Sequence, residues 1–261
     1  MTMNDQNLHA KIKASWENPE HTRLRITPRY ADTEYPVFTD LNEFIKQNGS
    51  QERLTILDFG AGNSPYKPHF PHADYRTADI LDGPGLTYHI GANGQIHERD
   101  EVFDLILSTQ VLEHVRDVPA YLAEAHRLLK KGGKLLLTTH GIWEEHGVPH
   151  DFQRWTEEGM KRDLTAANFH EIEVFKLTSG FRATLFIFIK GLFIAMPPRP
   201  LLARFFFKAF RFTISRLFPF FYRVSDRYWP EEKITRAGQS DFNPASYIII
   251  AALATKSFHE N

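Results

Sequence analysis

The stretch "LTILDFGAGNSPY", residues 54–66, decides the fold. Its first half is a short apolar run that ends in Asp58 and Gly60, which is typical of a buried parallel strand leading into a turn. Gly60 and Gly62 let the backbone approach a ligand closely and adopt dihedral angles that other residues resist. In α/β sheets, ligands bind at the carboxyl end of such a strand. The stretch therefore predicts a binding loop, although a tight strand-to-helix turn would use the same residues.

Further apolar runs repeat the pattern along the chain. With 54–60 they predict seven strands, the others at 73–80, 86–90, 102–108, 134–140, 171–177 and 246–254. Helical periodicity is found over 35–49, 117–131 and 156–169, and the second of these helices is expected to end at Gly132 and Gly133. Strands that alternate with helices indicate an α/β fold, a doubly wound, Rossmann-like seven-stranded sheet with helices on both faces.

Composition divides the chain into four parts. Residues 1–50 hold a polar arm, expected to be loose over 1–35, and then a helix. Residues 51–178 are expected to form the ligand-binding core. Residues 179–243 form a Phe-rich, basic insertion that should be an amphipathic helical lid, and residues 244–261 supply the last core strand and a tail. The insertion is far longer than an ordinary connection between two strands.

Several classes of protein do not fit the composition. The 261 residues carry a formal net charge of −1, which argues against a protein that coats nucleic acid. The absence of cysteine excludes disulfides, thiolate catalysis and cysteine-ligated zinc. The first residues lack the apolar run of a secretory signal, and no uncharged apolar stretch reaches the roughly 18 residues of a transmembrane helix. We expect a cytoplasmic protein, with peripheral attachment to the inner face of the membrane as an open alternative.

The glycine loop departs from the pattern of a dinucleotide site. Such a site has a third glycine three residues after the second, and here that position is Pro65. A ligand that has no phosphates does not need this glycine, so a nucleotide-dependent oxidoreductase is disfavoured. Asp79 ends the second strand, where a carboxylate can accept hydrogen bonds from two ribose hydroxyls or simply cap a turn.

Five ordered motifs carry a resemblance to a known family. The segments "ILDFGAG" (56–62), "TADI" (77–80), "FDLILSTQVLEHV" (103–115) and "RLLKKGGKLLL" (127–137), with a distal helix–strand pair, resemble class I S-adenosylmethionine-dependent methyltransferases of the type 11 kind. The resemblance covers roughly 54–178 and the last strand. It implies an enzyme that transfers a methyl group, with S-adenosylmethionine as its cofactor.

The same resemblance implies which residues hold the cofactor. The motif after the first strand would line its methionine half, namely Asp58, Gly60, Ala61, Gly62 and Asn63. Asp79 would hold the ribose, and Ile80 would pack on the adenine. Ser108 and Gln110, after the fourth strand, would lie beneath the sulfonium and the amino-acid part.

Methyl transfer to oxygen benefits from a base, and a first candidate is the segment "QVLEHV" (110–115). His114 and Glu113 follow the fourth strand, close to the expected position of the methyl group. Some O-methyltransferases that this chain resembles carry Glu-x-x-Glu-His here and bind a divalent metal. Because Gln110 replaces the first Glu, no metal is predicted. Glu113 and His114 would alternatively brace the following helix.

A second candidate is the segment 139–159, which mixes histidines with aromatic residues of the kind usually buried. With His114, its residues His140 and His150 are the predicted catalytic bases, while His140, His146 and His150 as metal ligands are disfavoured because a loop fixes no common geometry. The predicted substrate-binding residues come from this segment too, namely Asp151, Arg154 and Trp155, and Arg154 is expected to meet a phosphate or carboxylate. The alternative is that Asp151 and Arg154 only pair with each other to hold the loop.

The insertion admits three interpretations. A transmembrane hairpin is disfavoured by Lys190 and by Pro197-Pro198, and a helical cap buried on the sheet domain is the second alternative. The favoured interpretation is an interfacial helix on an anionic membrane through 181–223, in which Pro219 kinks or ends the helix. Phe-rich runs suit hydrocarbon better than phosphate, so nucleic acid is an unlikely partner.

Together these features predict O-methylation of a glycan or lipid-linked substrate at the membrane surface. The segment 149–159 supports this, since it resembles methyltransferases encoded with bacterial cell-surface polysaccharide genes. One alternative is a quinone-like or other small-molecule phenol as the acceptor. Another is a catalytically inactive, membrane-associated binding module.

Overall fold

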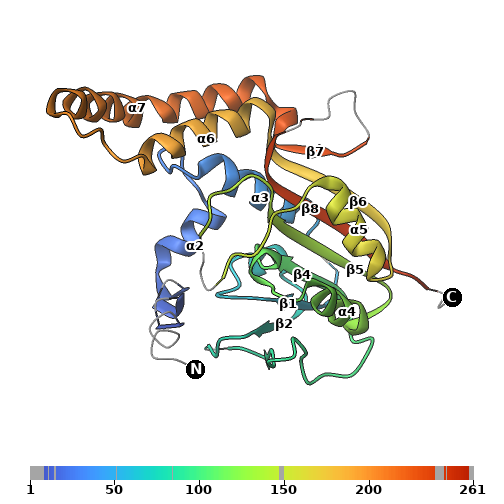
Figure 1. Ribbon diagram of the computed structural model, residues 1–261. Coiled ribbons are helices and arrows are strands. Elements are labelled where there is room, and N and C mark those ends of the chain that lie inside the picture. The colour runs from blue at the N-terminus through green and yellow to red at the C-terminus, as the bar shows by residue number, and fades with distance from the viewer. Residues whose placement is uncertain are drawn as a thin grey trace.

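The computed structural model describes residues 9–10, 12–14, 16–50, 52–83, 85–146, 150–238, 244 and 246–258. Its centre is one eight-stranded sheet with the order β3-β2-β1-β4-β5-β8-β6-β7 (Figure 1). The strands are β1 (Thr55–Phe59), β2 (Asp74–Asp79), β3 (Tyr88–His89), β4 (Phe103–Thr109), β5 (Leu129–His140), β6 (Phe169–Ser179), β7 (Ile234–Arg236) and β8 (Tyr247–Lys256).

The first five strands run parallel, and β8 lies antiparallel between β5 and β6. The prediction of an α/β, Rossmann-like sheet is therefore confirmed, with one strand more than expected. The extra strand is β7, which ends the insertion and pairs antiparallel with β6 through Phe175 and Leu177. Strand β7 has only three residues and no apolar run, so the sequence does not predict it. It forms because it pairs with β6.

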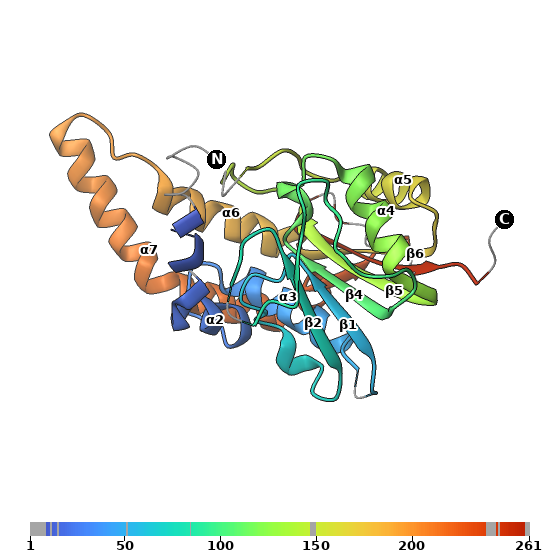
Figure 2. The same cartoon turned by 90° about the horizontal axis from the view of Figure 1, so that it is seen from below.

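Helices cover both faces of the sheet, as predicted (Figure 2). On one face, α4 (Val118–Leu128) and α5 (Glu157–Ala166) pack in a core with the inward side chains of the strands. On the other face, α3 (Tyr35–Gln47) and α6 (Gly180–Ile194) form a second core. Alternation along β1 supplies both cores, because Leu57 faces α4 and Ile56 faces α3.

The expectation of a loose arm over 1–35 is wrong for part of its length. Helix α2 (Pro19–Ile26) begins at the N-cap Asn18, whose side chain accepts a hydrogen bond from the backbone of Glu20. Arg23 in its last turn pairs with Glu20 and with Asp32. A helix held by its cap and its ion pairs needs no apolar face, so hydrophobic periodicity does not reveal it.

The sequence predicts that the helix over 117–131 ends at Gly132, and this prediction is wrong. Helix α4 ends at Leu128 and β5 begins at once, so Gly132 lies inside the strand with φ of +75°. The register between β4 and β5 shifts here, and a Cβ on Gly132 would lie 2.2 Å from the ring of Phe258. The glycine therefore forms a bulge under close packing rather than a helix cap.

The insertion forms a helical hairpin of α6 and the long helix α7 (Leu201–Tyr228), followed by the turn η3 (Pro230–Glu232) (Figure 1). The sequence predicts that Pro219 kinks or ends the helix; it does not end it, since α7 continues to Tyr228. Phe218 and Tyr222 on either side of the proline are buried against Tyr35, and this packing outweighs the lost hydrogen bond. Among the described residues, no helix is both long and apolar enough to cross a membrane.

Candidate active site

A cavity of about 940 Å³ opens at the carboxyl ends of β1 to β5. The loops that follow these strands line it, as the position of the glycine loop had suggested. Seven of the predicted cofactor residues lie in the lining: Gly60, Ala61, Gly62, Asn63, Asp79, Ile80 and Gln110. A cavity of this size is at the upper end of the range that holds small ligands, so it has room for a cofactor together with an acceptor.

The glycine loop is held in its shape by β2. Gly60 and Gly62 adopt φ of +86° and +53°, and a Cβ on Gly60 would lie 2.5 Å from Val111. The Oδ2 atom of Asp79 accepts a hydrogen bond from Gly62 N, and its Oδ1 atom accepts one from Leu81 N. Burial raises the pKa of Asp79, while these backbone donors oppose the rise. Asp79 thus fixes the loop and presents a carboxylate to the cavity.

The N-terminal arm roofs the glycine loop, which sequence reasoning did not foresee. Asn63 donates from Nδ2 to the carbonyl of Trp16 and to Oγ1 of Thr22. The Trp16 ring lies so close that a Cβ on Gly62 would be 3.3 Å from its Nε1. A side chain at this position would crowd the ring, so the arm and the loop form one wall of the cavity.

Asp58 and Ser108 lie behind the cavity wall, outside its lining. Asp58 accepts a hydrogen bond of 2.7 Å from the hydroxyl of Tyr75, and burial raises its pKa to about 7. Ser108 bonds to the hydroxyl of Tyr121, which in turn donates to the carbonyl of Phe59. Both side chains brace the ends of the strands that carry the loops.

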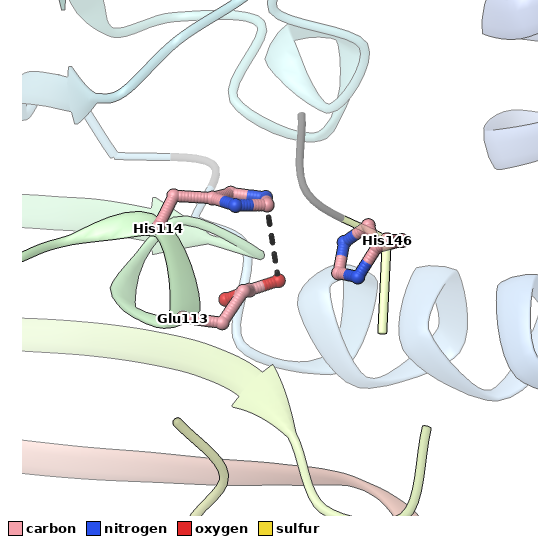
Figure 3. Close-up of side chains that lie close together, drawn as sticks. All are labelled: Glu113, His114 and His146. Carbon is pink, nitrogen blue, oxygen red and sulfur yellow. Dashed lines mark ion pairs between the residues drawn. The ribbon is translucent and has the colours of Figure 1, made fainter. Parts of the chain in front are cut away.

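Beside the glycine loop, Glu113, His114 and His146 point toward a common space (Figure 3). Glu113 and His114 belong to the turn η2 (Leu112–His114), whereas His146 comes from the loop after β5. Glu113 is buried, and its Oε2 accepts a hydrogen bond of 2.8 Å from Thr139. Its Oε1 lies 3.9 Å from His114 Nε2 and accepts no hydrogen bond from the described residues. Burial raises the pKa of Glu113.

Hydrogen bonds fix the tautomers of His114 and His146. The Nδ1 atom of His114 contacts the carbonyl of His150, which can only accept, so Nδ1 carries the proton. The Nδ1 atom of His146 lies 3.1 Å from Oδ2 of Asp151, and Arg154 holds the pKa of that carboxyl well below its usual range. The carboxylate therefore accepts from His146. In each ring the hydrogen bond occupies Nδ1, so Nε2 is the nitrogen left to accept a proton or to bind a ligand.

Burial is the main cause that lowers the pKa of two of these histidines, His140 and His146. Burial lowers the pKa of His146, and nearby His114 lowers it further, while Asp151 acts in the opposite direction. Burial also lowers the pKa of His140 to about 2. The ring of His140 stacks on Trp143 with centroids 4.6 Å apart, and its Nε2 lies 3.2 Å from Glu113 Oε1. A ring with a pKa near 2 is a poor base, so His146, whose pairing with Asp151 opposes the fall of its pKa, is the candidate base of the two.

The other predicted residues frame this cluster from outside the cavity. The side chain of His150 is exposed and packs on Phe152, so only its carbonyl serves the cluster. Asp151 is paired with Arg154, and Trp155 is buried with its Nε1 donating to Asp163. A contact of these three side chains with substrate stays a prediction. The residue missing from the predicted bases is His146, because its pairing with Asp151 depends on how the loop folds back.

Glu113, His114 and His146 could also hold a metal ion. Each offers one ligand atom, and these atoms lie within 4.8 Å of one another. Two imidazoles and a carboxylate suit a divalent cation such as Zn²⁺. Gln110, which led to the prediction of no metal, donates to Oγ1 of Thr138 instead. The third donor thus comes from His146, on a different loop, and a motif search over 110–114 does not find it.

Comparisons with known proteins agree with this architecture. A family model described as a methyltransferase domain matches residues 31–170, which is more than half of the chain. The crystal structure of a possible histamine N-methyltransferase, an S-adenosylmethionine-dependent methyltransferase from Thermotoga maritima, covers 96% of this chain and 100% of its own. The TM-score is 0.53 and the identity 14%, so this likeness concerns the fold alone.

Two curated relatives match over part of their length. The ubiquinone biosynthesis O-methyltransferase of Maricaulis maris is 34% identical over 104 residues, and that of Paramagnetospirillum magneticum is 29% identical over 103 residues. Each match covers 34% of this chain and 41% of the relative. The chain belongs to the methyltransferase domain family, which confirms the predicted class of S-adenosylmethionine-dependent methyltransferase.

Proposed function

We propose that this protein transfers a methyl group from S-adenosylmethionine to a hydroxyl of a small molecule, with a quinone-like phenol as the best fit. The observation that carries the proposal is the pair of His146 and Asp151. The hydrogen bond to Asp151 leaves Nε2 of His146 as the ring nitrogen that can accept a proton, and His146 lines the same cavity as the glycine loop. The two curated relatives act, by their names, in ubiquinone biosynthesis as O-methyltransferases, which supports a small-molecule acceptor over the predicted glycan or lipid-linked one.

The residues of the cavity suit the cofactor. The close backbone of Gly60 and Gly62, and the carboxylate of Asp79, form a cradle that side chains at the glycines would fill. S-adenosylmethionine, when bound, would supply a sulfonium methyl group, whose carbon–sulfur bond breaks toward sulfur as a carbon–oxygen bond forms. Such a displacement depends mostly on alignment, and the walls of the cavity provide it.

His146 acts as the general base in this proposal. The proton of the acceptor hydroxyl passes to Nε2 of His146, and the resulting imidazolium keeps its Nδ1 proton on Asp151. Asp151 stays ionised because Arg154 holds it, so it stabilises the positive ring without taking the proton. A phenol, with a pKa of about 10, gives its proton to an imidazole more readily than an alcohol does.

The experiment combines binding with turnover. Calorimetry should show binding of S-adenosylhomocysteine and not of NAD, since the glycine loop lacks the third glycine of a dinucleotide site. Methyl transfer from labelled cofactor should occur with catechol-type phenols and not with simple hexosides. Transfer to hexosides alone would overturn the assignment of the acceptor, and absence of S-adenosylhomocysteine binding would overturn the proposed activity.

A chelator separates the base from a metal site. Activity that survives EDTA supports His146 as the base. Activity that EDTA abolishes and a divalent cation restores would instead assign Glu113, His114 and His146 to a metal ion. The variant Glu113→Gln distinguishes the two cases by metal binding as well. It would remove a metal ligand but leave the pair of His146 and Asp151 intact.

A further inference from the structure

The end of the α6–α7 hairpin, residues 194–217 and here called the tip, exposes many large apolar side chains among basic residues. We propose that this tip docks the protein on an anionic lipid bilayer. The proposal is independent of the methyl acceptor. It rests on how the hairpin is anchored, on which side chains the tip exposes, and on the charge that accompanies them.

The base of the hairpin is fixed to the sheet domain by a buried ionic network. Arg182 of α6 is fully buried and pairs with Asp40 of α3 at 2.8 Å and with Asp226 of α7 at 2.6 Å. The hydroxyls of Tyr30 and Tyr35 both donate to Asp226. Breaking these contacts would leave buried charges without partners, so the base holds the hairpin in one position.

Among the residues that the structure describes, the tip beyond this base forms no ion pair with the sheet domain, and it extends away from the sheet (Figures 1 and 2). Phe218 and Tyr222 at the base are 4% and 0% exposed, whereas Phe206 is 62% exposed. The exposed large apolar side chains of the tip are Ile194, Met196, Leu201, Leu202, Phe205, Phe206, Phe210, Phe212 and Leu217. A helical cap, one of the alternatives for the insertion, would bury these side chains against the domain. A cluster of this extent marks an interaction surface.

The charges of the tip select an acidic partner. The tip contains Arg199, Arg204, Lys208, Arg211 and Arg216, and the chain has no Asp or Glu between Glu173 and Asp226. A second copy of the protein would bring two basic tips together, and their repulsion disfavours that pairing. Apolar side chains that enter the acyl boundary, flanked by Arg and Lys that meet anionic headgroups, are the pattern of an interfacial helix.

Docking by the tip would place the cavity near the bilayer, because α6, the first helix of the hairpin, contacts a residue that lines the cavity. Lys190 of α6 pairs with Glu144 at 2.7 Å and lies 3.7 Å from the ring centroid of Trp143. Trp143 lines the cavity. The attached protein would thus receive acceptors that partition into the membrane, whatever their chemical class.

The first test is flotation of the full chain with vesicles. Binding is expected to phosphatidylcholine vesicles that contain phosphatidylglycerol, to be weak with phosphatidylcholine alone, and to fall in high salt. The variants Phe205→Ser/Phe206→Ser/Phe210→Ser and Arg204→Gln/Lys208→Gln/Arg216→Gln should each lower the bound fraction at least tenfold. The matched control Arg227→Gln/Tyr228→Ser changes exposed residues at the domain end of α7 and should bind as the unmodified protein does.

Because the chain has no cysteine, a fluorophore can be attached to one introduced cysteine. Its emission reports contact with the bilayer in a protein that still binds vesicles. An environment-sensitive fluorophore on Phe206→Cys should shift to shorter wavelength with anionic vesicles, and one on Tyr228→Cys should not. Equal shifts at both positions, or equal flotation of the tip variants and the control, would overturn the proposal. A dimer in solution that the tip variants dissociate, with no vesicle binding, would also overturn it and assign the tip to a second copy. Circular dichroism and binding of S-adenosylhomocysteine verify that each variant is folded.

Discussion

The cavity at the carboxyl ends of the strands and the tip of the α6–α7 hairpin differ in which side chains are enclosed and which are exposed. In the cavity, titratable side chains are enclosed and held by specific partners, as His146 is by Asp151. At the tip, large apolar side chains such as Phe206 and Met196 are exposed among basic residues. The difference teaches that a substitution in the cavity should change chemistry or folding, whereas one at the tip should change only docking.

The largest expected effect is on turnover. His146→Gln removes the proposed base and should lower kcat by roughly 10²–10⁴ while binding of S-adenosylhomocysteine is retained. The matched control is His150→Gln, since that ring is exposed and lies outside the cavity lining. Steady-state kinetics with a phenolic acceptor measure both. Equal loss in the two variants would place the base elsewhere.

Next comes the stability of the hairpin base. Arg182→Met leaves Asp40 and Asp226 without their buried partner and should lower the free energy of unfolding by about 3–5 kcal/mol. Arg199→Met at the exposed tip should change it by less than about 0.5 kcal/mol. Urea denaturation followed by circular dichroism gives both values. A small effect at Arg182 would mean that the network does not hold the hairpin.

The free energy of unfolding should fall in acid partly because of the buried His140. Its pKa in the folded protein lies near 2, below the unfolded value, so the unfolded chain binds a proton that the folded chain excludes as pH falls below about 6.5. This ring therefore costs up to about 1.4 kcal/mol of stability per pH unit below that point, and nothing above it. His140→Gln should be less sensitive to acid than the unmodified protein between pH 6.5 and 5. His72→Gln, which changes an exposed ring, should not differ in this way.

The smallest expected effect belongs to the tip. Phe206→Ser should change the free energy of unfolding by less than about 0.5 kcal/mol, because the side chain is already 62% exposed. Phe218→Ala on the same helix should cost about 3–5 kcal/mol, because its ring is buried against Tyr222 and Phe193. Thermal and urea unfolding compare the two variants. Similar losses would show that the tip packs on the domain in solution.

Local patterns predicted the strands and the glycine loop well. The apolar run before Gly60 forms β1, and the loop after it lines the cavity with Asp79 close by. These features depend on neighbours in the chain, such as the turn that Gly60 and Gly62 permit. Hydrophobic periodicity does not predict helix α2, although Asn18 and Pro19 are start signals, because this helix has no buried face.

The choice among the histidines could not come from the sequence. His114, His140 and His150 were equally good candidates for the base, yet the carbonyl of His150 orients His114 across 36 positions of the chain. His146 acquires its tautomer only when the loop folds back onto Asp151 and Arg154. Hydrogen bonds between distant segments decide which nitrogen is free, and residue types at fixed spacing carry no such information.

By itself the sequence determined the α/β sheet, the glycine loop and an insertion rich in Phe and Arg, because periodicity, glycine positions and composition are local properties. Only the tertiary structure decided which of those Phe side chains are buried and which are exposed. Arg182 joins α6 to Asp40, 142 positions away, and thereby fixes where the packed base ends and the free tip begins. Burial depends on what a side chain meets after the chain has folded, and identical residues along α7 meet either the sheet domain or solvent.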